Sequence, residues 1–434
     1  MLKNLRYISV LILDKIFKDK AYSNLVLKNY LEKYSLKDVD KKLVTEIVYG
    51  TIKYKLSIDN ILNKFVKKID EKDISVMILR SALYQLNYLD RVPKYAVLNE
   101  SVEISKKLCK FKSSFVNGVL RNYLRNKDVI KNSKNTLEQE YSFVSWMVKL
   151  FKNQFPNDYI DIMKSLNGRA EVCYRINSYK ISKEELFDKF QSLKFEIIND
   201  SRNAINIKNL SNVFEDEVYK KGFITVQDLS SQIVCEIMNP VENDFILDLC
   251  GAPGGKSTYL AELIKDNGKI ISCDLHEHKI NLISQNAKRL GLKSLEPKLN
   301  DALVLNKSFV GCFDKVLLDA PCSGLGVIRK KPEIKWFKNQ EDLEQIINIQ
   351  RKMVEISSKY VKVGGILMYT TCTLNKNENE NIVNEFLKNN ENFVLEELNL
   401  DLFCGLKIKL NENMVTLLPS EFNDGFFISK LRRI

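Results

Sequence analysis

Histidine is nearly absent from this chain of 434 residues, which contains only His276 and His278. Two histidines at a predicted helix start are too few for a histidine-rich metal site, and solvated side chains are the simpler interpretation. The cysteines are odd in number and scattered, at positions 109, 173, 235, 250, 273, 312, 322, 372 and 404. None of them forms the C-x-x-C spacing of a zinc site. We therefore expect no metal, and we expect most cysteines to be small core residues in a reducing compartment.

Long hydrophobic runs are missing as well. No apolar stretch approaches the roughly 18 residues that span a bilayer, which excludes a membrane-spanning helix. A short apolar stretch near the start resembles a signal peptide, but Asp14, Lys15 and Lys18 follow where a small-residue cleavage site should lie. We expect an amphipathic first helix and a cytoplasmic protein.

Helix-breaking residues are scarce in the first third of the chain. Residues 1–150 contain one proline and two glycines. Apolar residues recur there at three- and four-residue spacing, as at Leu79, Leu83 and Leu86. Because the chain is too long for one ordinary core, we expect several domains. The first, over residues 1–130, is predicted to be all-helical, with six or seven helices.

Basic charge is concentrated in the same region. Residues 1–150 hold 29 Lys and Arg against 16 Asp and Glu, a net charge of +13, whereas residues 151–434 hold 38 against 39, a net charge of −1. A segregated excess favours attraction to a phosphate backbone, although a solvated basic face is the simpler interpretation. The candidate RNA contacts run from Lys106 through Lys112 and on to Arg121 and Arg125.

A polar stretch over residues 128–140 predicts a linker. Residues 141–224 are expected to form a small α+β connector module. Two helical stretches reach about residue 166; then come a strand candidate at 172–177, a helix candidate at 183–194, and strand candidates at 195–198 and 204–207.

From residue 225 to 434, short apolar strands alternate with helices. The strand candidates are Phe245–Asp248, Ile270–Cys273, Leu295–Asn300, Lys315–Leu318 and Ile366–Tyr369, and the helix candidates are 256–265, 277–290 and 341–361. This alternation predicts a Rossmann-like, doubly wound domain with a mostly parallel sheet.

A glycine-rich turn, Cys250-Gly-Ala-Pro-Gly-Gly-Lys256, follows the first of these strands. Ligands bind beyond the carboxyl ends of parallel strands, and glycine lets the backbone approach them closely. A nucleotide P-loop is excluded because the position six residues before Lys256 is Cys250, not glycine. The dinucleotide G-x-G-x-x-G pattern is also absent.

Acidic residues follow successive strands: Asp248, Asp274, Asp301 and Asp319. A single strand-end aspartate is usually a turn or helix cap, but the ordered set suits a ligand with a sulfonium cation and no phosphates. We therefore predict S-adenosylmethionine as the cofactor. Asp274 is expected to accept its ribose hydroxyls and Asp301 its adenine amino group.

Two cysteines follow strands at the same predicted edge, Cys322 in Asp-Ala-Pro-Cys-Ser-Gly and Cys372 in Thr-Thr-Cys-Thr. Carbon-5 of a pyrimidine is too weak a nucleophile to take a methyl group directly. A thiolate added to carbon-6 makes carbon-5 enamine-like, which is covalent catalysis. The pair suits methylation at carbon-5 of a pyrimidine such as cytosine, although either cysteine alone is more simply a core residue.

Asp319 and Lys256 complete the predicted catalytic set. Asp319 is expected to hydrogen-bond the cytosine ring at N3 and its amino group. Lys256 is expected either to lower the pKa of the reacting thiol or to hold the ring oxygen; a solvated lysine at a helix start is the alternative.

Together, Asp248–Ser257, Asp319–Gly324 and Thr371–Thr373 resemble the Nop/Sun family of RNA cytosine carbon-5 methyltransferases. The resemblance implies Cys372 as the nucleophile and Cys322 as the residue that helps release product. It also implies cofactor contacts from Cys250, Gly251, Ala252, Pro253, Gly254, Gly255, Lys256, Asp274, Asp301 and Asp319. Further matches are 226–231, 326–336 and 418–427.

The helical first third resembles an RNA-binding NusB-type domain, which narrows the resemblance to the bacterial B-type branch acting on 16S ribosomal RNA. Gly251 and Ser257 stand where this family usually has alanine and threonine, and both are conservative in size. A metal-free monomer acting on small-subunit ribosomal RNA is expected. The target base must be flipped out or unpaired.

Further strand contacts are expected from a basic loop near the site, although a solvated loop is an equal alternative. Its candidate residues are Arg329, Lys330, Lys331 and Lys335. Two other functions stay open: a DNA cytosine methyltransferase in which Cys322 attacks and Cys372 is dispensable, and an assembly factor with a vestigial methyltransferase domain.

Overall fold

The computed structural model describes residues 4–131, 135–198, 203–210 and 212–434. The chain divides into two compact units. The helical unit comprises Met1–Asn167 with Ile328–Phe337, and the catalytic unit comprises Gly168–Val327 with Lys338–Ile434. The helices that were expected in the connector, before residue 168, therefore belong to the helical unit.

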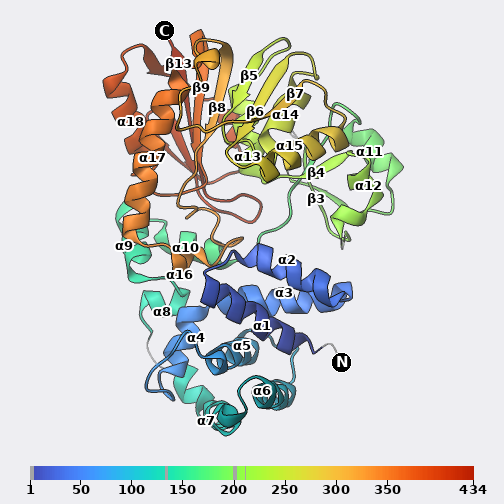
Figure 1. Cartoon of the computed structure of the whole chain (residues 1–434), viewed down its shortest axis with the longest axis vertical. Coiled ribbons are helices and arrows are strands. Elements are labelled where there is room, and N and C mark those ends of the chain that lie inside the picture. The colour runs from blue at the N-terminus through green and yellow to red at the C-terminus, as the bar shows by residue number, and fades with distance from the viewer. Residues whose placement is uncertain (1–3, 132–134, 199–202, 211) are drawn as a thin grey trace. The chain divides into compact units, whose positions relative to one another are not determined.

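The helical unit confirms the predicted all-helical region (Figure 1). Its helices are α1 (Leu5–Asp19), α2 (Ser23–Tyr34), α3 (Asp38–Lys53), α4 (Lys55–Leu62), α5 (Ile74–Tyr88), α6 (Lys94–Leu108), α7 (Ser113–Lys131), α8 (Leu137–Tyr141), α9 (Ser145–Gln154), α10 (Tyr159–Asn167) and α16 (Ile334–Phe337), with a 3-10 turn at Lys110–Lys112. The expected linker is partly wrong, because α7 and α8 extend into residues 128–140; residues 132–134 lie outside the described part of the chain.

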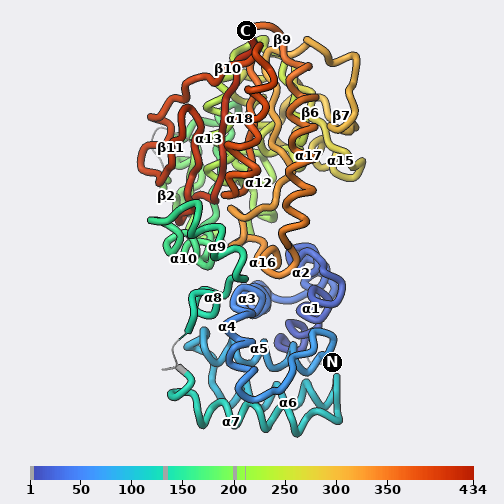
Figure 2. Tube along the Cα trace, turned by 90° about the vertical axis from the view of Figure 1, so that its left-hand side faces the viewer, coloured from blue at the N-terminus to red at the C-terminus, as the bar shows by residue number. Residues whose placement is uncertain are grey.

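Helix α5 is the centre of this unit. The predicted apolar stripe is buried: Leu79 and Leu83 have no exposed surface, and Leu86 has little. Its neighbours include α1, α3, α6 and α7, and Figure 2 shows α6 and α7 side by side. Burial of this stripe, at about 25 cal/mol per Å² of apolar area, drives the packing of the surrounding helices.

The segment Ile328–Phe337 follows a catalytic-unit strand in sequence but packs in the helical unit. The ammonium group of Lys335 is fully buried and donates to Lys53 O, Ser142 O and Asn167 Oδ1, at 3.1, 3.0 and 2.6 Å. It also lies 3.7 Å from the ring centre of Phe143. These three acceptors match the three donors of an ammonium group, although burial holds the pKa of Lys335 well below its usual value.

Two residues of this segment were therefore wrongly expected to grip RNA. Lys335 has no exposed surface, and Arg329 is only 5% exposed. Lys330 and Lys331 are exposed, so their RNA contact stays a prediction. Glu333 instead accepts from Ser23 N and Oγ, and Trp336 Nε1 donates to Ile52 O, which fixes the segment on α2 and α3.

The catalytic unit begins with a small antiparallel sheet in the order β2-β3-β1-β4. Its elements are β1 (Tyr174–Ile176), α11 (Lys183–Lys189), β2 (Phe195–Ile197), β3 (Ala204–Ile207), α12 (Glu217–Lys220) and β4 (Ile224–Val226), with a 3-10 turn at Val213–Glu215. The strand and helix candidates of the connector are confirmed, although the helix ends five residues earlier than expected.

The large sheet has the order β11-β12-β13-β9-β8-β5-β6-β7, with β10 paired to β13. Strands β5 to β9 pair in parallel, and the others pair antiparallel. The strands are β5 (Phe245–Asp248), β6 (Lys269–Asp274), β7 (Leu295–Leu299), β8 (Phe313–Asp319), β9 (Val361–Thr371), β10 (Phe393–Leu395), β11 (Ile408–Asn411), β12 (Met414–Leu417) and β13 (Phe426–Arg433). The predicted doubly wound sheet is confirmed.

Helices cover both faces of this sheet. Along β5, Ile246 packs toward α13 (Leu229–Met238), α14 (Gly255–Leu263) and α15 (Glu277–Leu290), whereas Leu247 packs toward α17 (Gln340–Ser358) and α18 (Glu380–Asn389). Alternate side chains of a strand point to opposite faces, which explains the continuous apolar runs of these strands.

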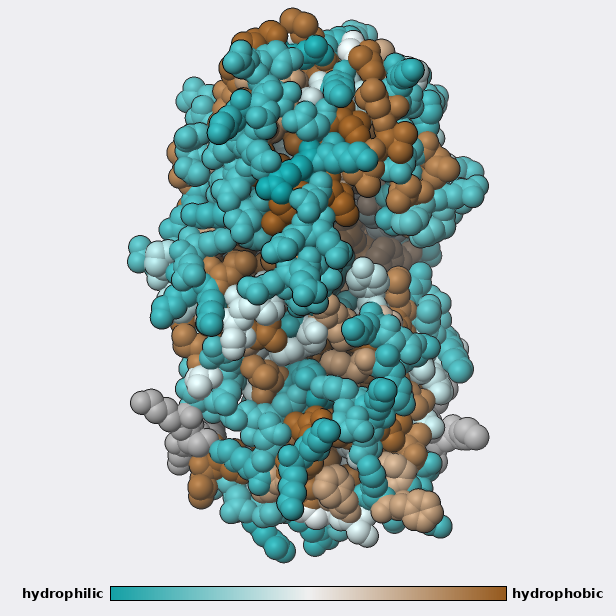
Figure 3. Space-filling model, turned by 60° about the vertical axis from the view of Figure 1, so that its left-hand side comes forward, coloured by the Kyte–Doolittle hydropathy of each residue, from teal (hydrophilic) through white to brown (hydrophobic). Residues whose placement is uncertain are grey.

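No helix in the described ranges is long and apolar enough to cross a membrane. On the face drawn in Figure 3, hydrophilic residues predominate and hydrophobic residues are exposed in separate small groups.

Replacement of Lys335 by methionine tests its structural role. The change leaves three buried acceptors without donors, so the free energy of unfolding should fall by about 2–4 kcal/mol. Both tryptophans of the chain, Trp146 and Trp336, lie in the helical unit. Urea unfolding followed by tryptophan fluorescence therefore reports on this unit. The exposed Lys331→Met variant is the control, and equal stability of the two variants would contradict the assignment.

Candidate active site

The strand order of the large sheet reverses between β5 and β8, which is where open α/β sheets bind ligands. Asp248 and Asp319 are the last residues of these two strands. Asp274 ends β6, and Asp301 follows β7 by two residues. The four predicted aspartates therefore lie along one edge of the sheet.

The glycine-rich turn is held against β6. Gly251 N donates to Cys273 O at 2.8 Å, and a Cβ on Gly251 would lie 2.1 Å from Ser272 Oγ. Ser257 Oγ donates to Asp248 Oδ2 and also contacts Ser272 Oγ, at 2.5 and 2.7 Å. A methyl group at position 251 would therefore force the Ser272 hydroxyl to move, so glycine there is not a neutral replacement for alanine in this chain.

Two buried polar atoms at this edge have no hydrogen-bond partner among the described residues: Asp248 Oδ1 and Asn300 Nδ2. Burial raises the pKa of Asp248 to about 6. Buried polar atoms are normally paired, so a ligand that hydrogen-bonds along this edge fits the site. The predicted cofactor carries such groups.

Asp274 and Asp301 also act locally as turn residues. Asp274 is 8% exposed and accepts from His276 N at 3.1 Å, with Lys279 Nζ 3.3 Å away. Asp301 Oδ1 accepts from Leu303 N at 2.9 Å. Each keeps a second carboxylate oxygen or lone pairs for a ligand, so the capping interpretation and the binding interpretation are compatible.

Lys256, in the first turn of α14, forms an ion pair with Asp319 at 2.6 Å. Although burial lowers it, the Asp319 carboxylate holds the pKa of Lys256 above its usual value. Thr370 Oγ1 donates to the other oxygen of Asp319, at 3.1 Å. Within the described residues, the side chain of Lys256 is paired with Asp319 and with the sulfur of neither Cys322 nor Cys372.

The two predicted cysteines meet beyond the ends of β8 and β9. Cys322 Sγ lies 3.2 Å from Cys372 Sγ, and both are free thiols. The hydrogen bond with Cys372, together with burial, holds the pKa of Cys322 well above its usual value. The two sulfurs are therefore within hydrogen-bond distance, and either thiol can be the donor to the other.

Glu378 is a structural residue of this site that the sequence patterns did not reveal. It has no exposed surface and accepts from Ser323 N and Oγ, Asn375 Nδ2 and Gln350 Nε2, at 2.8, 2.5, 3.1 and 3.2 Å. Ser323 directly follows Cys322, so Glu378 joins the two cysteine loops. The run of acidic and amide residues before α18 was the sequence feature that could have pointed to Glu378.

A close backbone approach fixes the loop of Cys372. Gly326 N donates to Cys372 O, and Gly425 N donates to Gly326 O, both at 3.0 Å. A Cβ on Gly326 would lie 2.0 Å from Gly425 O. Three segments that are distant in sequence therefore meet where only glycine fits.

Comparison with known proteins places the chain in a family. Residues 235–432 match the family described as 16S rRNA methyltransferase RsmB/F, residues 3–125 match the NusB family, and residues 143–213 match the ferredoxin-like domain of RsmF/B-like methyltransferases. The chain is 34% identical to the probable ribosomal RNA small subunit methyltransferase B of Bacillus subtilis, over 99% of both chains. The chain belongs to this methyltransferase B family. The corresponding Synechocystis protein is 31% identical over 99% of both chains.

The family membership confirms the resemblance that the cysteine and glycine motifs indicated. Solved structures agree in fold: PH0851 superposes with a TM-score of 0.82 at 24% identity, covering 100% of both chains. NSun6 from Pyrococcus horikoshii has a TM-score of 0.59 at 23% identity, covering 68% of this chain and 99% of that one.

Substitution of Gly251 by alanine tests the packing of the turn. Because the new methyl group would collide with Ser272 Oγ, the free energy of unfolding should fall by about 1–3 kcal/mol. Adding Ser272→Ala should restore most of the loss, since it removes the colliding atom. Urea unfolding followed by circular dichroism measures both, with Ser272→Ala alone as the control. A fully stable Gly251→Ala protein would contradict the packing described.

Proposed function

We propose that this protein transfers a methyl group from S-adenosylmethionine to carbon-5 of a cytosine in 16S ribosomal RNA. The observation that carries the proposal is the 3.2 Å approach of Cys322 Sγ to Cys372 Sγ, beside the paired Asp319. Two thiols beyond the ends of neighbouring parallel strands suit covalent attack on a pyrimidine and its reversal. Membership of the methyltransferase B family supports the substrate class.

The cofactor would occupy the edge formed by the ends of β5 to β8. It supplies an electrophilic methyl group on a sulfonium cation. We assign the backbone of Cys250–Lys256 to its close approach, Asp274 to its ribose hydroxyls and Asp301 to its adenine amino group. The unpartnered Asp248 Oδ1 and Asn300 Nδ2 support a polar ligand at this edge.

In the reaction, the thiolate of Cys372 adds to carbon-6 of the cytosine, and a sulfur–carbon bond forms. Carbon-5 then has enamine character and would take the methyl group, while the sulfur–methyl bond of the sulfonium breaks and leaves a neutral thioether. A base removes the carbon-5 proton, the carbon–sulfur electrons return to sulfur, and the double bond reforms. Cys322 would assist this release. The contact with Cys372 and burial raise the pKa of Cys322 and so disfavour its thiolate, which supports assigning the attack to Cys372.

Asp319 and Lys256 would hold the target base. Lys256 and Thr370 contact the two different oxygens of Asp319 and fix its carboxyl group. An ion-paired carboxylate is an acceptor, which favours a hydrogen bond from the cytosine amino group over proton donation to N3. Lys256, held by Asp319, is then available to the ring oxygen.

The helical unit would bind the RNA backbone. Residues 104–127 contain seven basic residues and no acidic one. Six of these are exposed on the end of α6, the following turn and α7: Lys106, Lys107, Lys110, Lys112, Arg121 and Arg125. Phe111, between two of the lysines, is fully exposed, and an exposed aromatic ring can stack on an unpaired base.

The two cysteines are distinguished by replacing each with alanine. Cys322→Ala should accumulate a denaturant-resistant protein–RNA adduct with 16S ribosomal RNA and cofactor, because attack proceeds and release fails. Cys372→Ala should form none. Denaturing gels measure the adduct, and sequencing maps methylcytosine. Adducts in Cys372→Ala alone would reverse the roles, and methylation by a protein without both cysteines would refute the mechanism.

Reversing charge on the basic surface tests RNA binding. The double variant Lys107→Glu/Lys110→Glu should bind 16S ribosomal RNA at least about tenfold more weakly. The affinity should also depend less steeply on salt concentration, by the amount expected for the loss of about one or two phosphate contacts. Filter binding over a salt series measures both. Lys352→Glu/Lys388→Glu makes the same charge change at exposed sites of the catalytic unit and is the control. If both variants lost the same RNA affinity, the loss would reflect net charge alone and would contradict a specific role for Lys107 and Lys110.

A further inference from the structure

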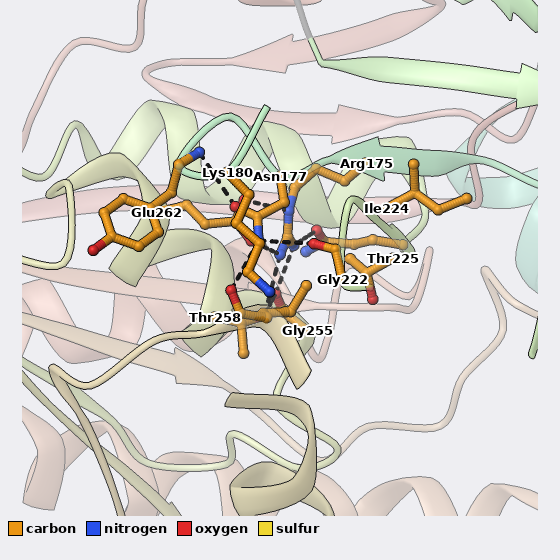
Figure 4. Close-up of polar contacts among 12 residues, drawn as sticks. Arg175, Asn177, Lys180, Gly222, Ile224, Thr225, Gly255, Thr258 and Glu262 are labelled. Atoms are coloured by element: carbon orange, nitrogen blue, oxygen red, sulfur yellow. Dashed lines mark hydrogen bonds and ion pairs between the residues drawn. The ribbon is translucent and has the colours of Figure 1, made fainter. Parts of the chain in front are cut away.

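Arg175, in the middle of β1, is a buried cation far in sequence from every residue of the proposed site. It has no exposed surface. All five of its N–H donors have partners, as Figure 4 shows in part. Nε and Nη2 donate to the Glu262 carboxylate at 3.0 and 2.7 Å, Nη1 donates to Gln227 Oε1 and to Gly255 O at 2.9 Å, and Nη2 donates to Thr258 Oγ1 at 3.2 Å.

Most of these partners lie on α14. Gly255, Thr258 and Glu262 span its first two turns, and the guanidinium also lies 4.6 Å from the ring centre of Tyr259. Helix α14 begins directly after the glycine-rich turn, and its second residue is Lys256, the partner of Asp319. Arg175 therefore holds the start of the helix that carries the proposed cofactor turn.

A buried ion pair is weak evidence for a stabilising role, because desolvation of two charges offsets their attraction. Arg175 and Glu262 are both fully buried in side chain. The planar guanidinium does fix the positions of its partners, because its five N–H groups point in set directions within one plane. A lysine at this position would keep the charge but lose that geometry.

We propose that Arg175 is a positioning residue, which sets the start of α14 and thereby orients the cofactor turn and Lys256. The inference rests on the proposed function only for the identity of the ligand. It gives the small ferredoxin-like sheet a role in cofactor binding, although none of its strands carries a residue of the proposed site.

A second anchor of the same sheet provides a matched control. Asn177 is also fully buried, and its Nδ2 donates to Gly222 O and Leu290 O, both at 3.0 Å. Lys180 Nζ donates to Arg289 O at 2.9 Å. These bonds reach the end of α15 instead of the start of α14. Loss of Asn177 should therefore affect packing of the sheet without moving the cofactor turn.

The test compares Arg175→Lys with Asn177→Ala in the full-length protein. For Arg175→Lys, we expect KM and Kd for S-adenosylmethionine to rise about tenfold or more, because small misplacements of binding groups have effects of this size. We expect the Kd for 16S ribosomal RNA to change less than about threefold, since the basic surface of the helical unit is not touched. Asn177→Ala should leave the cofactor KM unchanged.

Hydrogen exchange of the amides in residues 255–263 gives a readout without cofactor. Exchange there should accelerate in Arg175→Lys and not in Asn177→Ala, and unchanged exchange would overturn the inference. If the unaltered protein binds no S-adenosylmethionine, the proposed function fails, while the exchange result still decides the role of Arg175.

The double variant Arg175→Met/Glu262→Met separates positioning from stability. Because this variant leaves no unpaired charge buried, its free energy of unfolding should be close to that of the unaltered protein. Cofactor affinity should remain low, since the methionines cannot hold Gly255 O. Recovery of both stability and affinity would overturn the inference.

Discussion

The parallel pairing of β8 with β5 on one side and with β9 on the other brings together the chemistry of this site. Asp319 ends β8, so it meets Lys256 beyond β5 and Thr370 on β9. Three residues later Cys322 meets Cys372, which follows β9. The reversal of strand order at β5 and β8 leaves this edge open to a ligand, so a single feature of topology sets both the predicted cofactor position and the reacting thiols.

Buried polar side chains with every donor or acceptor used fix the loops of both units. Glu378 joins the loops of the two cysteines, Arg175 holds the start of α14, and Lys335 ties a loop to the helical unit. A buried charge is tolerated only where its partners are complete. Each such residue therefore permits one local geometry, and it holds its loop in a fixed conformation.

The segment Ile328–Phe337 shows how chain order and spatial grouping separate. It follows Cys322 by six residues, yet its side chains pack among α2, α3 and α10. The sequence predicted that its three lysines and one arginine bind RNA, but the structure buries two of these four residues. Because a basic side chain can be either solvated or buried against carbonyl oxygens, its residue type does not reveal its role.

The sequence by itself determined the doubly wound sheet and the helical first third. It also determined that the four aspartates and the two cysteines lie at the carboxyl ends of strands. These follow from local signals: apolar periodicity, glycine in turns, and strand ends that share an edge. Only the tertiary structure decided that the sulfurs of Cys322 and Cys372 lie in contact, that Gly251 packs against Ser272, and that Arg175, Glu378 and Lys335 are buried with their polar groups paired. Such facts depend on contacts between residues distant in sequence, which periodicity and spacing do not encode.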